Sequence, residues 1–417
     1  MNFAPLPKLS IPAPLIGAEK GSFTEFTVTQ RMPDIARRIV KENNFPSDIN
    51  DKLENLANEL VSGDVQPLQP DTGADFSTWQ KYLEPYQGQR WIDIPWFFAE
   101  TYFYRLILNI TNYFNPGQWE GVDPFALQKE RGLESSLDAI ATLSSQVEKW
   151  LNSSIETEMS PELSNHKALI ALLYFDLWGN RVDLSLWSAL GDENRAEFDI
   201  DTQQGHILVD DSEQVANLLT KLQSGRVDFI VDNAGFELIC DLCLVDFILS
   251  SGLVSQAKLH LKPHPTFVSD ATIKDVLHTI DLLANSNKGE IASSGQRLQR
   301  HLGSEKLILT DNYFWTSPLA AWEISDPLKN ELGEAELIIV KGDANYRRLL
   351  GDRHWNYSTD IADIVCYLPS PMIALRTLKS EVAAGIPTDV IAKLNQTDPN
   401  WLTNGQWGVV QLVMGNG

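Results

Sequence analysis

Cysteine is scarce in this chain of 417 residues, which contains only Cys240, Cys243 and Cys366. Three thiols are too few for a disulfide framework, and they indicate a reducing compartment. Cys240 and Cys243 form a C-x-x-C pair, but a zinc site would require two more ligands of that kind. Because both lie in a leucine-rich segment that we predict to be helical, we interpret them as buried thiols that behave as small apolar residues.

Long hydrophobic runs are also missing. No stretch stays apolar for the ~20 residues that a membrane span requires. The first residues, "MNFAPLPKLSIPAPLIGAEKG", lack the basic region and apolar core of a signal peptide. We therefore expect a cytoplasmic protein without a membrane partner.

Positive charge is in short supply, because 33 Lys and Arg residues face 56 Asp and Glu residues and the formal net charge is −23. An acidic surface repels phosphate backbones, which argues against nucleic acid as a partner. It does not exclude a small anionic substrate, since a metal ion or a few local cations can reverse the field inside one pocket. The hydrophobic content of 43% is enough for a sizeable core, so the chain is globular.

The sequence motifs of several large enzyme classes are absent as well. No G-x-G-x-x-G follows a predicted strand, and neither a G-x-x-x-x-G-K-[ST] loop, nor H-E-x-x-H, nor G-x-S-x-G occurs. These absences argue against a phosphate-binding loop, a zinc protease and a serine hydrolase. They also disfavour a standard dinucleotide or adenosyl-cofactor site.

The sequence falls into two regions with different patterns of apolar residues. Apolar residues recur with helical spacing over 31–43, 94–114 and 133–155. From about residue 205, strand-like and helical patterns alternate. We therefore predict a mainly helical N-terminal subdomain, residues 1–195, and an α/β domain, residues 196–417.

The strand-like segments of the second region are short and rich in Val, Ile and Leu. They are 206–210, 227–231, 258–262, 306–310, 335–340, 363–368, 372–376 and 407–413. Helical patterns over 212–223, 236–250, 271–285 and 344–350 separate most of them. This alternation predicts an α/β fold: a doubly wound, mostly parallel, Rossmann-like sheet with helices on both faces.

Polar residues gather where the predicted strands end. In an open parallel sheet, ligands bind outside the carboxyl ends of the strands. The polar residues at those positions are Asp232, Asn233, His264, Asp270, Asp311, Asn312, Lys341 and Asp343. Their convergence on one edge predicts a site for a metal ion or a phosphate.

The strongest candidates for metal ligands are Asp232, Asn233 and Asp270. Two carboxylates and an amide make a hard, oxygen-rich and partly open site that suits Mg or Mn, and also Co or Ni. Gly235 would let the backbone turn close to the ion. Each residue has a plainer alternative, since Asp and Asn are favoured in turns, Asp270 could be a helix N-cap, and Glu237 suits the start of a helix.

Several stretches together resemble a known family. "VDNAGFEL", "KPHPTFVSD", "KGDANYRRLLGD" and "RTLK" resemble the damage-control phosphatases, formerly grouped under domain of unknown function 89. The "RTLK" element is similar to the R-T-x-K signature of the subfamily that contains the acidic-residue methyltransferase-like proteins. Weaker likenesses are "FTVTQRMPDIARRI", "PWFFAETYFYRLI" and "LWGNRVDLS" in the first half of the chain.

The resemblance implies a metal-dependent phosphatase, a hydrolase acting on phosphorylated sugars and related metabolites, with Mn, Ni, Co or Mg as cofactor. It implies Asp232, Asn233 and Asp270 as metal ligands. The implied substrate-binding residues are Glu237, Lys341, Asp343, Asn345, Tyr346, Arg347, Arg376 and Lys379. Ala344 stands where the family usually has leucine, which we expect to alter packing and not chemistry. Two alternatives stay open: S-adenosylmethionine-dependent methylation of protein carboxylates, and non-catalytic binding of sugar phosphates.

The mechanism that follows is metal-assisted hydrolysis of a small phosphorylated substrate, with Asp232, Asp270 and Lys379 as catalytic residues. The ion polarises a phosphoryl oxygen and activates a water. Lys379, together with Lys341 or Arg347, offsets charge on the transferring group. The sequence leaves open whether Asp232 orients the water or attacks phosphorus itself, and it fixes neither the natural substrate, nor the native metal, nor the oligomeric state.

Overall fold

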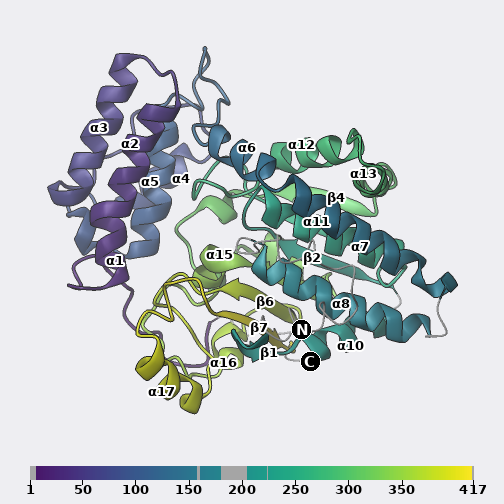
Figure 1. The fold of residues 1–417 in the computed structure, drawn as a ribbon. Coiled ribbons are helices and arrows are strands. Elements are labelled where there is room, and N and C mark those ends of the chain that lie inside the picture. The colour runs from purple at the N-terminus through teal and green to yellow at the C-terminus, as the bar shows by residue number, and fades with distance from the viewer. Residues whose placement is uncertain (1–5, 157–159, 180–203, 223, 416–417) are drawn as a thin grey trace.

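The computed structural model describes residues 6–156, 160–179, 204–222 and 224–415. Figure 1 shows one twisted sheet covered by helices, with a group of N-terminal helices beside it. The strands are β1 (Ile207–Asp210), β2 (Arg226–Ile230), β3 (Gln256–Leu261), β4 (Leu307–Asp311), β5 (Leu337–Lys341), β6 (Met372–Thr377) and β7 (Gly408–Val413). Each of them coincides with a predicted strand.

The sheet has the order β1-β7-β6-β5-β2-β3-β4. Strands β6, β5, β2, β3 and β4 are parallel to one another. Strand β7 is antiparallel to β6, and β1 runs parallel to β7 at the edge. The predicted doubly wound, mostly parallel α/β fold is therefore confirmed, and the strand order reverses direction between β2 and β5.

The strands contribute to two separate hydrophobic cores, one on each face of the sheet. In β5, Leu337 and Ile339 pack into one core, and Ile338 and Val340 pack into the other. This is the period of two that a pleated strand imposes, and both faces are apolar because both are covered. The helices over the first face are α6 (Ala126–Glu134), α7 (Leu137–Glu156), α8 (Pro161–Trp178), α10 (Ser212–Leu222), α11 (Phe236–Ser250), α12 (Ile273–Ala284) and α13 (Gly289–Gly303).

The second face carries short C-terminal helices and the N-terminal helical group. The short helices are α14 (Asp326–Leu332), α15 (Gly342–Leu349), α16 (Ile361–Val365) and α17 (Thr388–Thr397). The N-terminal group consists of α1 (Phe23–Phe26), the π-helical turn η1 (Thr27–Arg31), α2 (Met32–Glu42), α3 (Ser47–Ser62), α4 (Phe76–Leu83) and α5 (Trp96–Ile110). Its large rings, among them Trp79, Trp91 and Trp96, share a core with Ile338 and Val340 of the sheet.

One predicted strand is wrong. Residues 363–368 do not extend the sheet, because Ile361–Val365 form the single helical turn α16. Asp360 starts this turn by accepting a hydrogen bond from Ala362 N, and Ile364 and Val365 are then both buried on the same side. The segment is apolar enough for a strand, but the preceding cap gives its backbone a helical start.

Helices α13, α14 and α17 were not predicted.

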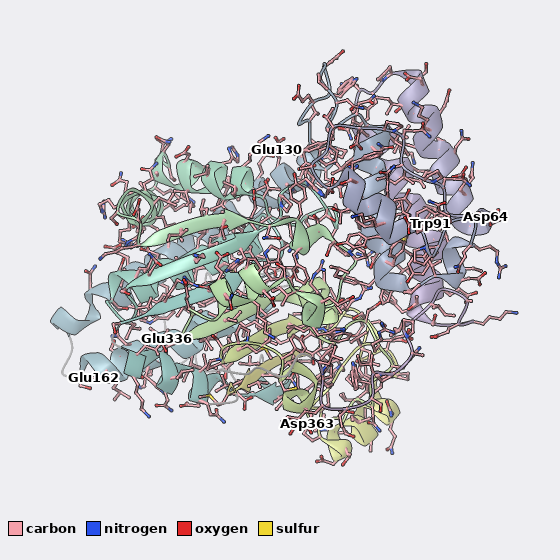
Figure 2. All side chains as sticks on the ribbon, turned by 180° about the vertical axis from the view of Figure 1, so that it is seen from behind. Asp64, Trp91, Glu130, Glu162, Glu336 and Asp363 are labelled. Atoms are coloured by element: carbon pink, nitrogen blue, oxygen red, sulfur yellow. The ribbon has the colours of Figure 1, made fainter. Side chains whose placement is uncertain are left out.

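The domain boundary predicted between residues 195 and 196 lies outside the described residues, as does most of the "LWGNRVDLS" stretch. In the described ranges, no helix combines the length and the apolar character that crossing a bilayer requires. Acidic residues lie on several sides of the surface: Asp64, Glu130 and Glu162 are exposed and well separated in Figure 2. Cys240 and Cys243 are free and buried in α11, as predicted.

Candidate active site

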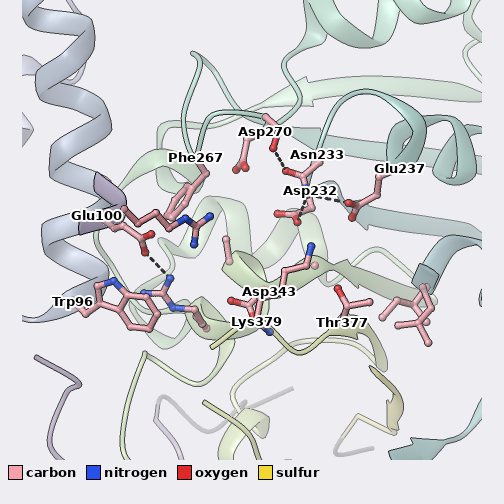
Figure 3. A pocket seen from close by; sticks show the side chains of 17 residues that line it. Trp96, Glu100, Asp232, Asn233, Glu237, Phe267, Asp270, Asp343, Thr377 and Lys379 are labelled. Carbon is pink, nitrogen blue, oxygen red and sulfur yellow. Dashed lines mark hydrogen bonds and ion pairs between the residues drawn. The ribbon is translucent and has the colours of Figure 1, made fainter. Parts of the chain in front are cut away.

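A cavity of about 380 Å³ opens where the strand order reverses, at the carboxyl ends of β2 and β5. This crevice is where ligands bind in doubly wound sheets. Figure 3 shows Asp232, Asn233, Glu237 and Asp270 on one side and Trp96 and Glu100 on the other. The full lining comprises Arg31, Trp96, Glu100, Leu177, Asp232, Asn233, Glu237, Phe267, Ser269, Asp270, Gly342, Asp343, Ala344, Arg347, Leu375, Thr377 and Lys379.

The loops after β2 and β3 bring Asp232 and Asp270 together. Asn233 and Asp270 form an isolated antiparallel bridge. Ala271 N donates to Asp232 O at 2.8 Å, and Ala234 N donates to Ser269 O at 2.7 Å. The backbone pairing therefore fixes the two carboxylates relative to each other. Asp270 does not cap α12, because Thr272 is the N-cap and forms a capping box with Asp275.

The Asn233 side chain lies between two carboxylates. Its Nδ2 donates to Asp232 Oδ2 at 2.8 Å and to Glu237 Oε2 at 2.9 Å, and its Oδ1 accepts from Ser269 Oγ at 2.6 Å. A hydroxyl can accept as readily as it donates. If a cation lies between the carboxylates, the amide can therefore rotate so that Oδ1 faces the cation, while Nδ2 donates to Ser269 Oγ.

The carboxylates at this site are buried with little positive charge beside them. Burial raises the pKa of Asp232 well above its ordinary value, and the charges of Asp270 and Glu237 raise it further. Burial also raises the pKa of Asp270, although the Lys262 ammonium 3.2 Å from its Oδ2 opposes that shift. Among the described residues, Asp232 Oδ1 has no hydrogen-bond donor. A cation would stabilise both carboxylates in their charged form.

A divalent ion fits this donor set. Two buried carboxylates and an amide oxygen would leave positions open for water and a phosphate. In the part of the chain that the structure describes, no group of three or more His, Cys, Asp or Glu side chains is placed to hold a metal ion. The site would therefore need the amide oxygen of Asn233 and outside ligands such as water or phosphate. Gly342 keeps the space beside Asp232 clear, because a Cβ there would overlap the carboxylate. Gly235 has a φ of +76°, a conformation that residues with a side chain rarely adopt.

Asp343 organises the R-T-x-K turn. Its Oδ1 accepts from Arg376 Nε at 2.9 Å, from Lys379 N at 3.1 Å and from Ser380 Oγ at 3.0 Å. Burial alone would raise the pKa of Asp343, but Arg376 and Arg347 outweigh it and the pKa is lowered. Asp343 is thus an anchored carboxylate that holds the backbone of Lys379 at the pocket.

The cations in the lining differ in their partners. Arg347 pairs with Glu100 at 2.6 Å and with Asp352 at 2.7 Å, and its guanidinium stacks on Trp96 with the ring centroid 3.5 Å away. Within the described ranges, no carboxylate forms an ion pair with Lys379 or Arg31. These two cations are available to an anion that enters the cavity.

Four of the residues expected to bind substrate do not line the cavity. Lys341 is buried beneath it and pairs with Asp176 at 2.6 Å and Asp241 at 3.3 Å. The Asn345 amide donates to Lys341 O and Val231 O. Tyr346 OH donates to Gln411 Oε1, and Arg376 binds Asp343. His264, Asp311 and Asn312 lie outside the lining as well.

Other lining residues escaped prediction, although most lie in stretches that carry the family resemblance. They are Arg31, Trp96, Glu100, Leu177, Phe267, Ser269, Leu375 and Thr377. Phe267 and Ser269 belong to "KPHPTFVSD", and Arg31 belongs to "FTVTQRMPDIARRI". Ala344 also faces the cavity, so the departure from leucine falls at the site itself.

A doubly wound sheet whose switch point carries an oxygen-rich donor set and a lysine provides the groups that metal-assisted hydrolysis of a phosphate ester would require. Comparison with known proteins specifies the family. Residues 27–394 match the model of the damage-control phosphatase ARMT1-like domain. The chain belongs to this family, and the predicted phosphatase class is confirmed.

Curated relatives are similar over almost their whole length. Damage-control phosphatase ARMT1 of Danio rerio is 33% identical, with 96% of this chain and 97% of the relative covered. The Rattus norvegicus and Homo sapiens proteins of the same name are 31% and 30% identical, with 96% of this chain and 98% of each relative covered. A crystal structure of a DUF89 family protein from Pyrococcus horikoshii matches with a TM-score of 0.46 and 15% identity, covering 94% of this chain and 98% of that one. None of these findings favours the methyltransferase alternative.

Proposed function

We propose that this protein hydrolyses phosphomonoesters of small metabolites, phosphorylated sugars and related compounds, with a divalent cation held by Asp232, Asn233 and Asp270. The observation that supports this most is the placement in one cavity lining of two buried carboxylates and Lys379, which forms no ion pair with any described residue. The carboxylates attract a cation and the lysine attracts a phosphate. The name shared by the curated relatives supports the same reaction class.

The chain's own residues account for most of the proposed chemistry. A bound divalent cation, Mn, Ni, Co or Mg, would polarise a phosphoryl oxygen and lower the pKa of a water. Lys379 offsets the negative charge of the transferring group, which is the main task in phosphoryl transfer. Asp232 or Asp270 orients the attacking water. Asp343 keeps Lys379 in place through the hydrogen bond to its backbone N–H.

The remaining named residues divide by their position. Glu237 lies in the lining and holds the Asn233 amide, so it orients a metal ligand. Arg347 lies in the lining but is fully paired, so it braces the wall against Trp96. We assign Lys341, Asn345, Tyr346 and Arg376 positioning roles beneath the cavity. A net charge of −23 argues against nucleic-acid and anionic-membrane partners and leaves a small molecule as the substrate. The scarcity of cysteine supports a cytoplasmic location.

The test is phosphate release from a panel of sugar phosphates by chelated protein that is reconstituted metal by metal. Asn233→Ala should raise the metal concentration needed for half-maximal activity by about tenfold or more, since an inner ligand is lost. Asn312→Ala removes a strand-end amide outside the cavity and should leave that concentration unchanged. The proposal is overturned if the protein keeps full activity without residual metal by elemental analysis, or releases no phosphate with any metal.

A further inference from the structure

The N-terminal helix is interrupted next to the cavity. Between α1 and α2, Thr27–Arg31 form a π-helical turn in which Met32 N donates to Thr27 O, five residues back. Pro33 explains the turn, because a proline inside an α-helix clashes with the carbonyl four residues earlier, here Thr29. Widening the turn relieves that clash. Such turns are often found at functional sites.

The last residue of this turn, Arg31, lines the cavity. Its side chain is exposed, and in the described ranges it forms no ion pair. Its exposure, and the lack of a carboxylate partner among the described residues, make its five N–H donors accessible to a ligand. Arg347, the other arginine of the lining, has its guanidinium occupied by Glu100 and Asp352.

The two unpaired cations of the lining come from different parts of the fold. Lys379 follows β6 at the carboxyl edge of the sheet, on the element that Asp343 anchors. Arg31 belongs to the N-terminal helical group, which packs beside the sheet. If the phosphoryl group lies at the carboxylates and Lys379, Arg31 faces the rest of the substrate.

We propose that Arg31 binds a second oxyanion of the substrate, a carboxylate or a second phosphate, on the side of the cavity that the N-terminal helices form. This inference rests on the proposed function for the orientation of the phosphoryl group. A planar guanidinium matches the two oxygens of an oxyanion in a fork, which a single hydroxyl cannot do. Glu100, which the N-terminal helices also bring to the lining, is already paired with Arg347 and therefore repels an anion at Arg31 less than a free carboxylate would.

The test uses phosphonates, which resist hydrolysis. Alkylphosphonates and ω-carboxyalkylphosphonates of matched, graded length are titrated calorimetrically into the protein in the presence of Mn²⁺. At one range of lengths the terminal carboxylate should tighten binding by about tenfold, the size of one charge-assisted contact. The best length measures the span between the two cations.

Variants show which residue produces the gain in affinity from the terminal carboxylate. Arg31→Ala should abolish the gain from the carboxylate, and Arg31→Lys should keep part of it. Arg38→Ala removes an exposed arginine of the same helical run outside the lining and should keep all of it. Lys379→Ala should weaken both series alike. The proposal is overturned if no length shows a gain, or if the gain survives Arg31→Ala. Phosphonate binding with this pattern but no phosphate release from any ester would refute the proposed function and leave Arg31 as an anion-binding residue.

Discussion

Gly342 and Asp232 lie so close that a Cβ built on Gly342 would be 1.9 Å from Asp232 Oδ2. The first comes from the end of β5 and the second from the end of β2, neighbours in the sheet on either side of the reversal in strand order. Gly342 also has a φ of +76°, which side chains rarely adopt. The glycine therefore determines where the Asp232 carboxylate sits.

We predict that Gly342→Ala displaces the Asp232 carboxylate and lowers affinity for Mn²⁺, measured by calorimetric titration, by about tenfold or more. Gly88→Ala is the matched control, since Gly88 has a φ of +72° but nothing within 4 Å of its added Cβ. The Gly88→Ala variant has the same unfavourable backbone conformation, but its Cβ overlaps no neighbouring atom. Equal Mn²⁺ affinity in Gly342→Ala and wild type would show that Asp232 does not contribute to ion binding.

Lys379→Ala should lower kcat/KM for a sugar phosphate by about 10- to 1,000-fold, because a charge-assisted contact in a partly dry site contributes a few kcal/mol. Its ammonium is the phosphate-facing charge of the R-T-x-K turn. Lys306→Ala, which removes an exposed lysine just before β4, should have no effect on turnover. Steady-state kinetics on both variants decide whether Lys379 acts on phosphate, and unchanged turnover in Lys379→Ala would contradict it.

Ala344→Leu should narrow the cavity, since Ala344 belongs to its lining beside Asp343. A leucine side chain there would reduce the space for the substrate without changing the charge of the cavity. We expect kcat/KM to fall more for a hexose phosphate than for a triose phosphate, while the midpoint of thermal unfolding stays close to that of wild type. An equal fall for both substrates would indicate that the residue affects catalysis and not size selection.

Acid should weaken the contact between the N-terminal helices and the loop after β3. Arg105 binds Asp71 and Asp75, and His264 Nε2 lies 3.4 Å from Asp75 Oδ2. Burial alone would raise the pKa of Asp75, but the His264 imidazole beside it and the charge of Arg105 lower it to about 2. The charged form therefore stabilises the fold above the ordinary pKa of 3.8, and this contribution is lost as pH falls toward 2.

Asp75→Asn should accordingly reduce the free energy of unfolding by about 2 kcal/mol at pH 7, and by about half as much at pH 3. Urea unfolding of both proteins across this range measures the difference. A deficit that stays the same at pH 3 and pH 7 would mean that the loss comes from packing and not from the carboxylate charge.

The strands were predictable because buried parallel strands are continuous runs of Val, Ile and Leu, as in β5 and β6. The side chains that leave the carboxyl ends of β2 and β3 were predictable for the same reason, since the topology of such sheets brings those ends together. Residues 363–368 have a similar composition, but the Asp360 cap makes them begin as a helix. Composition alone does not register that local hydrogen bond.

The lysines at the site show what composition and spacing leave undecided. Lys341 has the same parity in β5 as Leu337 and Ile339, so it points to the face covered by α8 and meets Asp176. That direction follows from the pleat only once the helix covering that face is known. Arg31 is harder still, because helical periodicity does not state which sheet edge a helix more than 200 residues away will face.

The pairing of β1 with the last strand, β7, has a consequence for biosynthesis. β1 lies at the edge of the sheet and is hydrogen-bonded to β7, which separates it from β6. On the ribosome, residues 207–210 emerge long before residues 408–413, so β1 cannot take its place when the parallel strands first assemble. Pairing at such a separation is slow, and an unpaired strand is prone to join another chain. The β6 edge of the sheet therefore lacks its partner β7 until translation is almost finished, and it is in this interval that a chaperone would protect the nascent protein.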